Sequence, residues 1–382
     1  MRLRTVLTVL CTAVMVSGGL PASAEEPGPV RFPRLPGVPP DLGGDNYQKK
    51  PGKVGFGAGG SLFVTDLRWS NWGSSRTTGM GTAHAQSCDP TCAEGGYRLW
   101  RARLELSSIG KAGGVRQYLC WQLTYLSGPQ RDEGFYHCQM LAPPPYPEPD
   151  AGSGKFGSRK PSRADRDFKR LMRRAADVGE GLGYTHAAAN LRHYLDASGK
   201  PKDMKTSQML RDLPELRQGI AAKLRFLDPK LRNKVLKKFR KAGDKQASEH
   251  FRTPWYGDVY NNRDENKDWF YATAGFYYQL SGYVTASPAP QPAGEPEVTM
   301  HYRISTYDRY NWDGGKKAKL GPIVISDKLM QELHETGLAR EYDLRGSTPK
   351  MTRQVGTGGP VTIDPPAGNR EGNRVDPGRQ RG

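Results

Sequence analysis

The chain has 382 residues and a formal net charge of +18, from 57 Lys and Arg against 39 Asp and Glu. This length is enough for two domains, and the excess of positive charge favours anionic partners such as wall polymers, acidic lipid headgroups or pyrophosphate-bearing envelope intermediates. No nucleic-acid motif or aromatic–basic groove pattern is present, so we predict no nucleic-acid partner.

The N-terminus has the pattern of a cleavable secretory signal peptide. Arg2 and Arg4 give a positive start, residues 5–20 are apolar and small, and Pro21-Ala22-Ser23-Ala24 forms an A-x-A cleavage site. A retained anchor is the weaker alternative, because the apolar run is shorter than the roughly 20 residues that span a bilayer. We predict removal of residues 1–24 and a secreted, extracellular protein.

Residues 25–60 are rich in Pro and Gly and predict a flexible linker. From residue 61 to 142 apolar residues alternate with polar ones between turn signals, as in Trp100, Ala102, Leu104 and Leu106. This pattern predicts a small all-β domain over 61–142.

Four cysteines remain after cleavage, Cys88, Cys92, Cys120 and Cys138. An even number in an exported protein predicts two disulfides, and four cysteines allow three connectivities. A zinc site is the alternative, although the spacing lacks the repeated short pairs of a zinc ribbon. Trp69 to Gly73 followed by Cys88 to Gly95 resembles a small disulfide-containing β module of secreted actinobacterial proteins, a resemblance that implies no chemistry.

Residues 143–162 predict a second linker rich in Pro and Gly, and 163–348 an α+β domain. Helical periodicity begins near Phe168, and Asp212-Leu213-Pro214 and Asp228-Pro229 mark the start of two further helices. Between residues 151 and 250, 25 Lys and Arg stand against 11 Asp and Glu, so these helices carry almost all of the positive excess.

After Trp269 the periodicity changes to that of strands, with Val298, Met300, Tyr302 and Ile304 spaced by two, and a helix over 327–335 precedes a closing strand. The predicted fold class is therefore α+β, with an all-β N-terminal domain followed by a helical-then-antiparallel-β C-terminal domain. Residues 349–382 predict a disordered tail.

One segment gathers chemistry-bearing side chains at the end of a predicted strand. It runs Tyr307-Asp308-Arg309-Tyr310-Asn311-Trp312-Asp313-Gly314-Gly315-Lys316-Lys317. Carboxylates beside lysines can hold a divalent cation while the lysines neutralise phosphate. The same residues are also those of an ordinary β-turn, and spacing alone favours the turn.

From about Asn190 to Gly346 the order of elements, with the strands leading into Asp308-Arg309-Tyr310-Asn311, resembles the catalytic domain of colicin M. That family of bacteriocins cleaves the lipid-linked peptidoglycan precursor lipid II with magnesium. The resemblance implies a secreted antibacterial hydrolase in which Asp308 is the essential aspartate. It differs from the family pattern at Asn311, where a second aspartate is expected, and at Lys317 and Ala318, where a His-Arg pair is expected.

The resemblance implies that Asp308 and Tyr310 take the places of the family's aspartate and tyrosine, and that magnesium takes part. For the family residues that are missing here we predict replacements from this sequence. Asn311 and His334 complete the catalytic set, with His334 of the 327–335 helix carrying the proton. Asp313 joins Asp308 in holding magnesium, and Lys316, Lys317 and Arg309 bind the phosphates. The partners are the bacterial envelope, a lipid-linked precursor or wall polymer, and a possible immunity protein.

Two other functions stay open at this point. One is a non-catalytic basic protein that binds cell wall or lipid, and the other is a structural protein whose β domain docks a partner. Binding that weakens steeply with salt and ignores Asp308→Ala favours the binding protein over the enzyme.

Overall fold

The protein is described by a computed structural model. The predicted signal peptide, Cys88, Cys92, Asp313 and Lys316 lie outside the described residues, as do the side chains of Lys317 and Ala318. The described residues are 29–33, 48–56, 61–87, 95–112, 114–141, 143–147, 154–260, 262–289, 291, 294–312, 317–320, 323–356 and 361–363.

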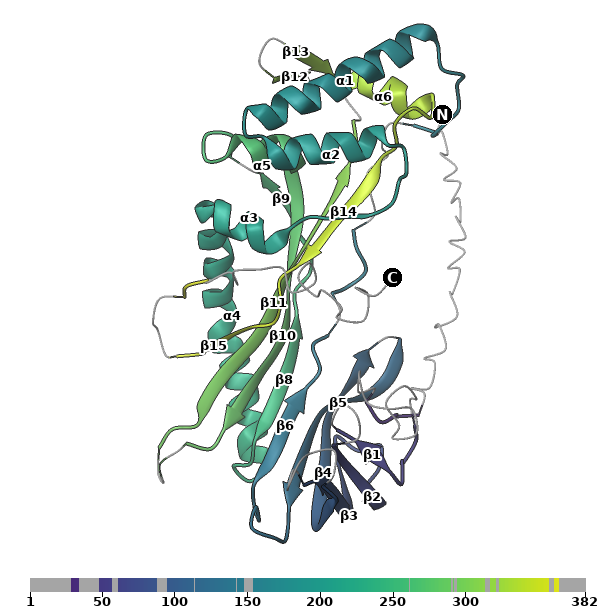
Figure 1. The fold of residues 1–382 in the computed structure, drawn as a ribbon. Coiled ribbons are helices and arrows are strands. Elements are labelled where there is room, and N and C mark those ends of the chain that lie inside the picture. The colour runs from purple at the N-terminus through teal and green to yellow at the C-terminus, as the bar shows by residue number, and fades with distance from the viewer. Residues whose placement is uncertain are drawn as a thin grey trace, which may run out of the picture.

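The N-terminal part forms a six-stranded antiparallel sheet whose strands pair in chain order (Figure 1). Period-two alternation directs one side of each strand inward, and Val64, Leu104 and Leu123 are fully buried there. The strands are β1 (Val54–Gly55), β2 (Leu62–Ser70), β3 (Arg76–Gln86), β4 (Tyr97–Ala112), β5 (Val115–Tyr125) and β6 (Gly134–Cys138).

Part of the predicted 25–60 linker belongs to this core. Val30, Phe32 and Val54 are almost completely buried, and Arg31 forms a parallel bridge with Gln117 of β5. Apolar residues are few in this segment, so its composition alone did not reveal that these three pack against the sheet.

A second, seven-stranded sheet is built on a long hairpin of two central strands. One edge of that hairpin receives two strands in succession, and the other edge receives two more. The strands are β7 (Lys202–Asp203), β8 (Ala247–Arg252), β9 (Tyr256–Tyr260), β10 (Gly275–Ser287), β11 (Glu297–Tyr310), β14 (Tyr342–Ser347) and β15 (Met351–Gln354), and a separate hairpin consists of β12 (Lys317–Leu320) and β13 (Ile323–Ser326).

Six helices accompany the second sheet. The longest runs along β8 and β10 and buries Ile220, Leu224, Val235 and Phe239, while four others gather at one end of the sheet (Figure 1). The helices are α1 (Arg163–Gly181), α2 (Thr185–Leu195), α3 (Thr206–Asp212), α4 (Pro214–Lys241), α5 (Lys267–Thr273) and α6 (Asp327–Glu335).

The predicted layout, an all-β N-terminal domain followed by a helical-then-β domain, is wrong. About 29% of the described structure is helical and 37% is strand, and β7, β8 and β9 are interleaved with the helices. These strands are short and polar, so they show no clear alternation; they form because they complete the edges of the β10–β11 hairpin.

The first sheet is also not a separate unit. The Tyr136 hydroxyl of β6 lies 2.6 Å from Ser248 Oγ of β8, and Cys120, Cys138 and Tyr283 of β10 share one buried cluster. The Cys138 end of β6 therefore packs against the second sheet.

Two helix boundaries differ from the sequence prediction. Asp228-Pro229 does not start a new helix, because α4 continues through Pro229, whose ring lies on the exposed side of the helix. Trp269, predicted to begin a strand, lies in α5, where Asn266 accepts a hydrogen bond from the Trp269 backbone N–H and caps the helix.

The predicted disordered tail, residues 349–382, includes residues that belong to the fold. Residues 351–354 form β15 on the edge of β11, and Val355, Val361 and Ile363 are buried in the core of the second sheet. Residues 364–382 lie outside the described part of the chain. In the predicted 143–162 linker, Tyr146 packs on Tyr307 at 5.0 Å between ring centroids.

The first turn of α1 carries a capping box that gives a testable stability effect. The Asp165 N–H donates to Ser162 Oγ at 3.1 Å, and the Ser162 N–H donates back to the Asp165 carboxylate at 2.7 Å. We expect Ser162→Ala to lower the free energy of unfolding by about 1 kcal/mol. Urea denaturation measures this, with the exposed Ser158→Ala as the matched control; equal midpoints for the two variants would contradict it.

Candidate functional site

The predicted catalytic segment lies at the end of β11. Asp308 and Tyr310 project to the same side of the strand, since their positions differ by two. Tyr310 is buried and stacks on Tyr342 of β14, with ring centroids 5.1 Å apart. Burial raises the pKa of the Tyr310 hydroxyl, and the charge of Asp308 adds to the effect. Tyr310 is therefore protonated at physiological pH and packs in the core.

The space beside Tyr310 is small and apolar. A cavity of about 60 Å³ is enclosed there by Trp312, Ile325 and small residues of α1 and α2. Such a lining offers few partners for a pyrophosphate, which needs several charged or N–H donors. Asn311 follows directly after the strand, and Lys317 is the first residue of β12.

Arg309 projects to the opposite side of β11 and is engaged by carboxylates. Its guanidinium lies 2.8 Å from Asp343 Oδ1 and 3.7 Å from Glu341 Oε2. Burial by itself would raise the pKa of Asp343, but hydrogen bonds from Arg309 and Arg345 outweigh it and hold that pKa below its usual value. The predicted phosphate ligand is thus part of an internal ion-pair network.

His334 of α6 is only 4% exposed, and both of its ring nitrogens have partners. Nε2 lies 3.1 Å from the Gly154 carbonyl oxygen, and the Glu341 backbone N–H donates to Nδ1 at 3.3 Å. This arrangement assigns the proton to Nε2 and joins α6 to the segments before α1 and after α6. His334 is placed as a packing residue, and its nitrogens face backbone groups.

A second histidine–carboxylate pair has a structural explanation as well. His186 Nδ1 lies 2.7 Å from Asp268 Oδ2, and Asp268 also accepts hydrogen bonds from the backbone N–H groups of His186 and Ala187. Asp268 of α5 therefore caps the first turn of α2 across a tertiary contact. Its position is explained by helix capping.

A basic cleft lies elsewhere, between the two sheets. It has a volume of about 870 Å³, and its walls come from β3, β4, β5, β8 and the end of α4. We call it the basic cleft; its charged lining consists of Arg76, Arg116, Lys238, Lys241 and Lys245 together with Glu105 and Glu249. Five cations against two carboxylates leave a local charge of +3 when His250 is neutral.

The two carboxylates compensate only part of this charge. Glu249 lies 2.6 Å from Lys238 Nζ, and Glu105 lies 3.5 Å from Arg76. Lys241 and Lys245 have no carboxylate within ion-pair distance in the part of the chain that the structure describes. Both are exposed, so their ammonium groups are available to an anion in the cleft.

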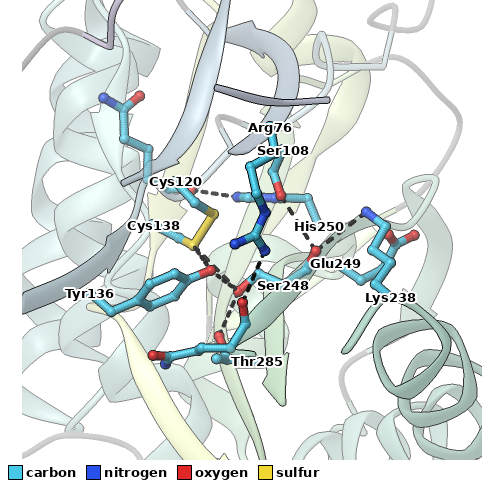
Figure 2. Close-up of a disulfide and its surroundings, with 12 residues drawn as sticks. Arg76, Ser108, Cys120, Tyr136, Cys138, Lys238, Ser248, Glu249, His250 and Thr285 are labelled. Carbon is cyan, nitrogen blue, oxygen red and sulfur yellow. Dashed lines mark hydrogen bonds and ion pairs between the residues drawn. A yellow bond between two sulfur atoms is a disulfide. The ribbon is translucent and has the colours of Figure 1, made fainter. Parts of the chain in front are cut away.

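A disulfide lies next to Ser248 and His250, two residues of the cleft lining (Figure 2). Cys120 and Cys138 stand directly opposite each other on β5 and β6. The Tyr136 hydroxyl lies 3.3 Å from Cys138 Sγ and 2.6 Å from Ser248 Oγ, and Ser248 continues to Thr285 Oγ1 at 2.8 Å. This hydrogen-bonded chain fixes the first sheet against the second beside the cleft.

His250 also lines the cleft. Its Nε2 lies 3.0 Å from the Gln139 carbonyl oxygen, which assigns the proton to Nε2. Burial lowers the pKa of His250 to about 4, and the positive charge of Lys238 adds to this, against the opposing effects of the Gln139 hydrogen bond and Glu249. At neutral pH the ring is uncharged.

The cysteine predictions are resolved in part. One disulfide, Cys120–Cys138, is present, which favours disulfide over zinc for these two residues. The sulfurs lie with the His250 ring within 4.8 Å, but sulfurs in a disulfide are not thiolates and do not ligate zinc in that form. Magnesium binding by Asp308 and Asp313 stays a prediction, because Asp313 lies outside the described residues.

Sequence analysis did not find the basic cleft. The charge excess of residues 151–250 identified the cationic helix, but Arg76 reaches the Gln246 carbonyl from 170 residues away in the chain. No local pattern joins those two segments.

A search of known protein families, curated proteins and solved structures finds no match, so nothing there bears on the colicin M resemblance. Among the described residues, no helix is both long and apolar enough to cross a membrane.

Proposed function

We propose that the protein is an exported binding protein for anionic, phosphate-bearing ligands of the cell envelope, and that the basic cleft is its binding site. The observation that carries the proposal is the cleft's net charge of +3, with Lys241 and Lys245 unpaired in the described structure. Phosphate oxygens accept charge-assisted hydrogen bonds from such ammonium groups. A volume of about 870 Å³ admits several units of a phosphodiester polymer or a pyrophosphate headgroup.

The chemistry of the cleft favours binding over hydrolysis. A general acid or base works best with a pKa near the operating pH, and His250 is neutral with a pKa of about 4. Glu249 and Glu105 are engaged by Lys238 and Arg76. The lysines and arginines that line the cleft can therefore attract an anion, but His250, Glu249 and Glu105 are not suited to transfer a proton.

The location follows from two features that support each other. The first 24 residues predict a signal peptide, and disulfides such as Cys120–Cys138 form and persist in oxidising compartments. An extracellular cation of this kind meets wall polymers and lipid-linked precursors, both of which carry phosphate.

The test measures binding of soluble poly(glycerol phosphate) to the mature protein. We expect Lys241→Gln/Lys245→Gln to weaken binding about tenfold, because two cations leave the cleft. The matched control, Lys155→Gln/Lys200→Gln, removes two exposed lysines outside the cleft and is expected to bind as the unmodified protein does. Equal affinity of the two double variants would overturn the cleft as the binding site.

The hydrolase prediction is separated by a second measurement. Mature protein is incubated with lipid II and magnesium, and release of the pyrophosphoryl-sugar is followed beside Asp308→Ala. On the binding proposal no release occurs with either protein, and both bind equally. Release that is lost on Asp308→Ala would favour the enzyme instead.

A further inference from the structure

The outer side of α4 is unusual in exposing a large aromatic residue among cations. Phe226 is 78% exposed, more than any other large apolar side chain in the described structure. Lys223, Phe226, Lys230, Asn233, Lys237 and Arg240 follow one another at alternating spacings of three and four residues, and all are exposed. We call this row the α4 stripe; it extends over about 25 Å of helix.

The stripe is not needed to build the core. The opposite side of α4 buries Leu224, Val235 and Phe239 against the second sheet, whereas Phe226 points away from it. Figure 1 shows α4 running along β8 and β10. Burial of the inner side is enough to stabilise the helix, so the exposed phenyl ring has no role in the packing of the described fold.

The charge around Phe226 has one sign. From residue 219 to 241 the helix carries nine Lys and Arg and a single acid, Asp228. Asp228 is buried and paired with Arg353, so it does not compensate the stripe. Lys223 lies over the Tyr256 ring at 4.8 Å, and its ammonium group stays at the surface.

We infer that the α4 stripe is a docking surface for a bilayer containing anionic phospholipids. Lys230, Lys237 and Arg240 lie at the level of the lipid phosphates, and the Phe226 ring enters the boundary between headgroups and acyl chains. Juxtaposed lysines attract the anionic surface, and a single buried aromatic side chain adds the apolar contact that charge alone lacks.

A bilayer fits the stripe better than a soluble polyanion does. A polymer of phosphodiesters satisfies the lysines but offers no apolar layer for Phe226, whereas a bilayer offers both phosphates and an apolar layer. This surface is distinct from the basic cleft, whose unpaired cations are Lys241 and Lys245. The two sites can therefore be tested apart.

The test is co-sedimentation with vesicles of phosphatidylcholine and phosphatidylglycerol. We expect Phe226→Ala to weaken vesicle binding at least about fivefold, since the inserted ring is lost. Lys230→Gln/Lys237→Gln is expected to weaken it by a similar factor and to reduce its dependence on salt. The control Phe135→Ala, a 51%-exposed phenylalanine on β6, is expected to bind as the unmodified protein does.

Three results decide the inference. Vesicle binding by Phe226→Ala equal to that of Phe135→Ala overturns it, and so does a loss confined to the lysine variant, which would indicate a site for soluble polyanions. Unchanged binding of poly(glycerol phosphate) by Phe226→Ala, together with lost vesicle binding, supports it. The cleft variant Lys241→Gln/Lys245→Gln tests the proposed function separately through the polymer. Thermal unfolding of each variant verifies the fold.

Discussion

Arg353→Ala is expected to lower the free energy of unfolding by about 4 kcal/mol, since it leaves the carboxylate of Asp228 buried without a partner. Arg353 of β15 contacts Asp228 of α4, and the two side chains are 14% and 12% exposed. The pair joins the helix that carries the cleft lysines and the α4 stripe to the edge of the second sheet.

A double-mutant cycle measures this coupling. Denaturation in urea gives the free energy of unfolding for Arg353→Ala, Asp228→Ala and the double variant. We expect the double variant to be more stable than Arg353→Ala alone, because it removes the unpaired charge together with its former partner. Strictly additive losses would show that the two side chains do not interact in solution.

Lowering the pH from 7 to 4 is expected to destabilise the protein, with about 3 kcal/mol contributed by His250. The pKa of His250 is about 4 in the folded protein and 6.5 in a model peptide. Between these values the unfolded chain binds a proton that the folded protein does not. His250 therefore does not lower the free energy of unfolding above pH 6.5. Below that pH its effect lowers the free energy of unfolding by about 1.4 kcal/mol per pH unit, and below pH 4 the effect is constant.

The comparison with His250→Gln isolates this effect. A glutamine amide retains a donor for the Gln139 carbonyl oxygen but does not titrate. We expect the free energy of unfolding of the variant, measured by urea denaturation from pH 7 to pH 4, to fall less steeply with pH. The reason is that unfolding of the variant takes up about one proton fewer. Burial also lowers the pKa of His301 to about 4, so the variant keeps a residual slope. Parallel curves for the two proteins would contradict the burial of a neutral His250.

The two proposed surfaces share α4. Lys238 and Lys241 lie toward the basic cleft, while Phe226 and Lys230 lie on the stripe. A protein held at an anionic bilayer by the stripe would keep its cleft close to membrane-linked phosphate ligands. A single cationic helix thus serves both proposals, because a helix presents different residues to different sides.

Some of the fold could be predicted because it depends on local periodicity. The alternation in Leu104 and Leu106 identified β4, the row from Val298 to Ile304 identified β11, and the helix predicted over 327–335 is α6. β8 and β9 were missed because their residues are polar or aromatic without alternation. They adopt strands through pairing with β10, a partner that a local window does not contain.

The candidate site shows the same division. Asp308 and Tyr310 do lie on one side of a strand, as a spacing of two requires. However, Tyr310 is buried against Tyr342, and His334 is hydrogen-bonded to Gly154, both because of segments that are distant in the chain. Residue type and spacing identified candidates, but burial and partners determine what each side chain can do.

The sequence by itself determined the positive charge and its concentration in the helices after residue 151, and it predicts an export signal, because these depend only on composition and local order. Only the tertiary structure decided that Cys120 pairs with Cys138, that Arg76 reaches the Gln246 carbonyl, and that a cationic cleft lies between the sheets. The physical reason is that pairing of sheet edges and burial of charge depend on contacts between residues far apart in the chain.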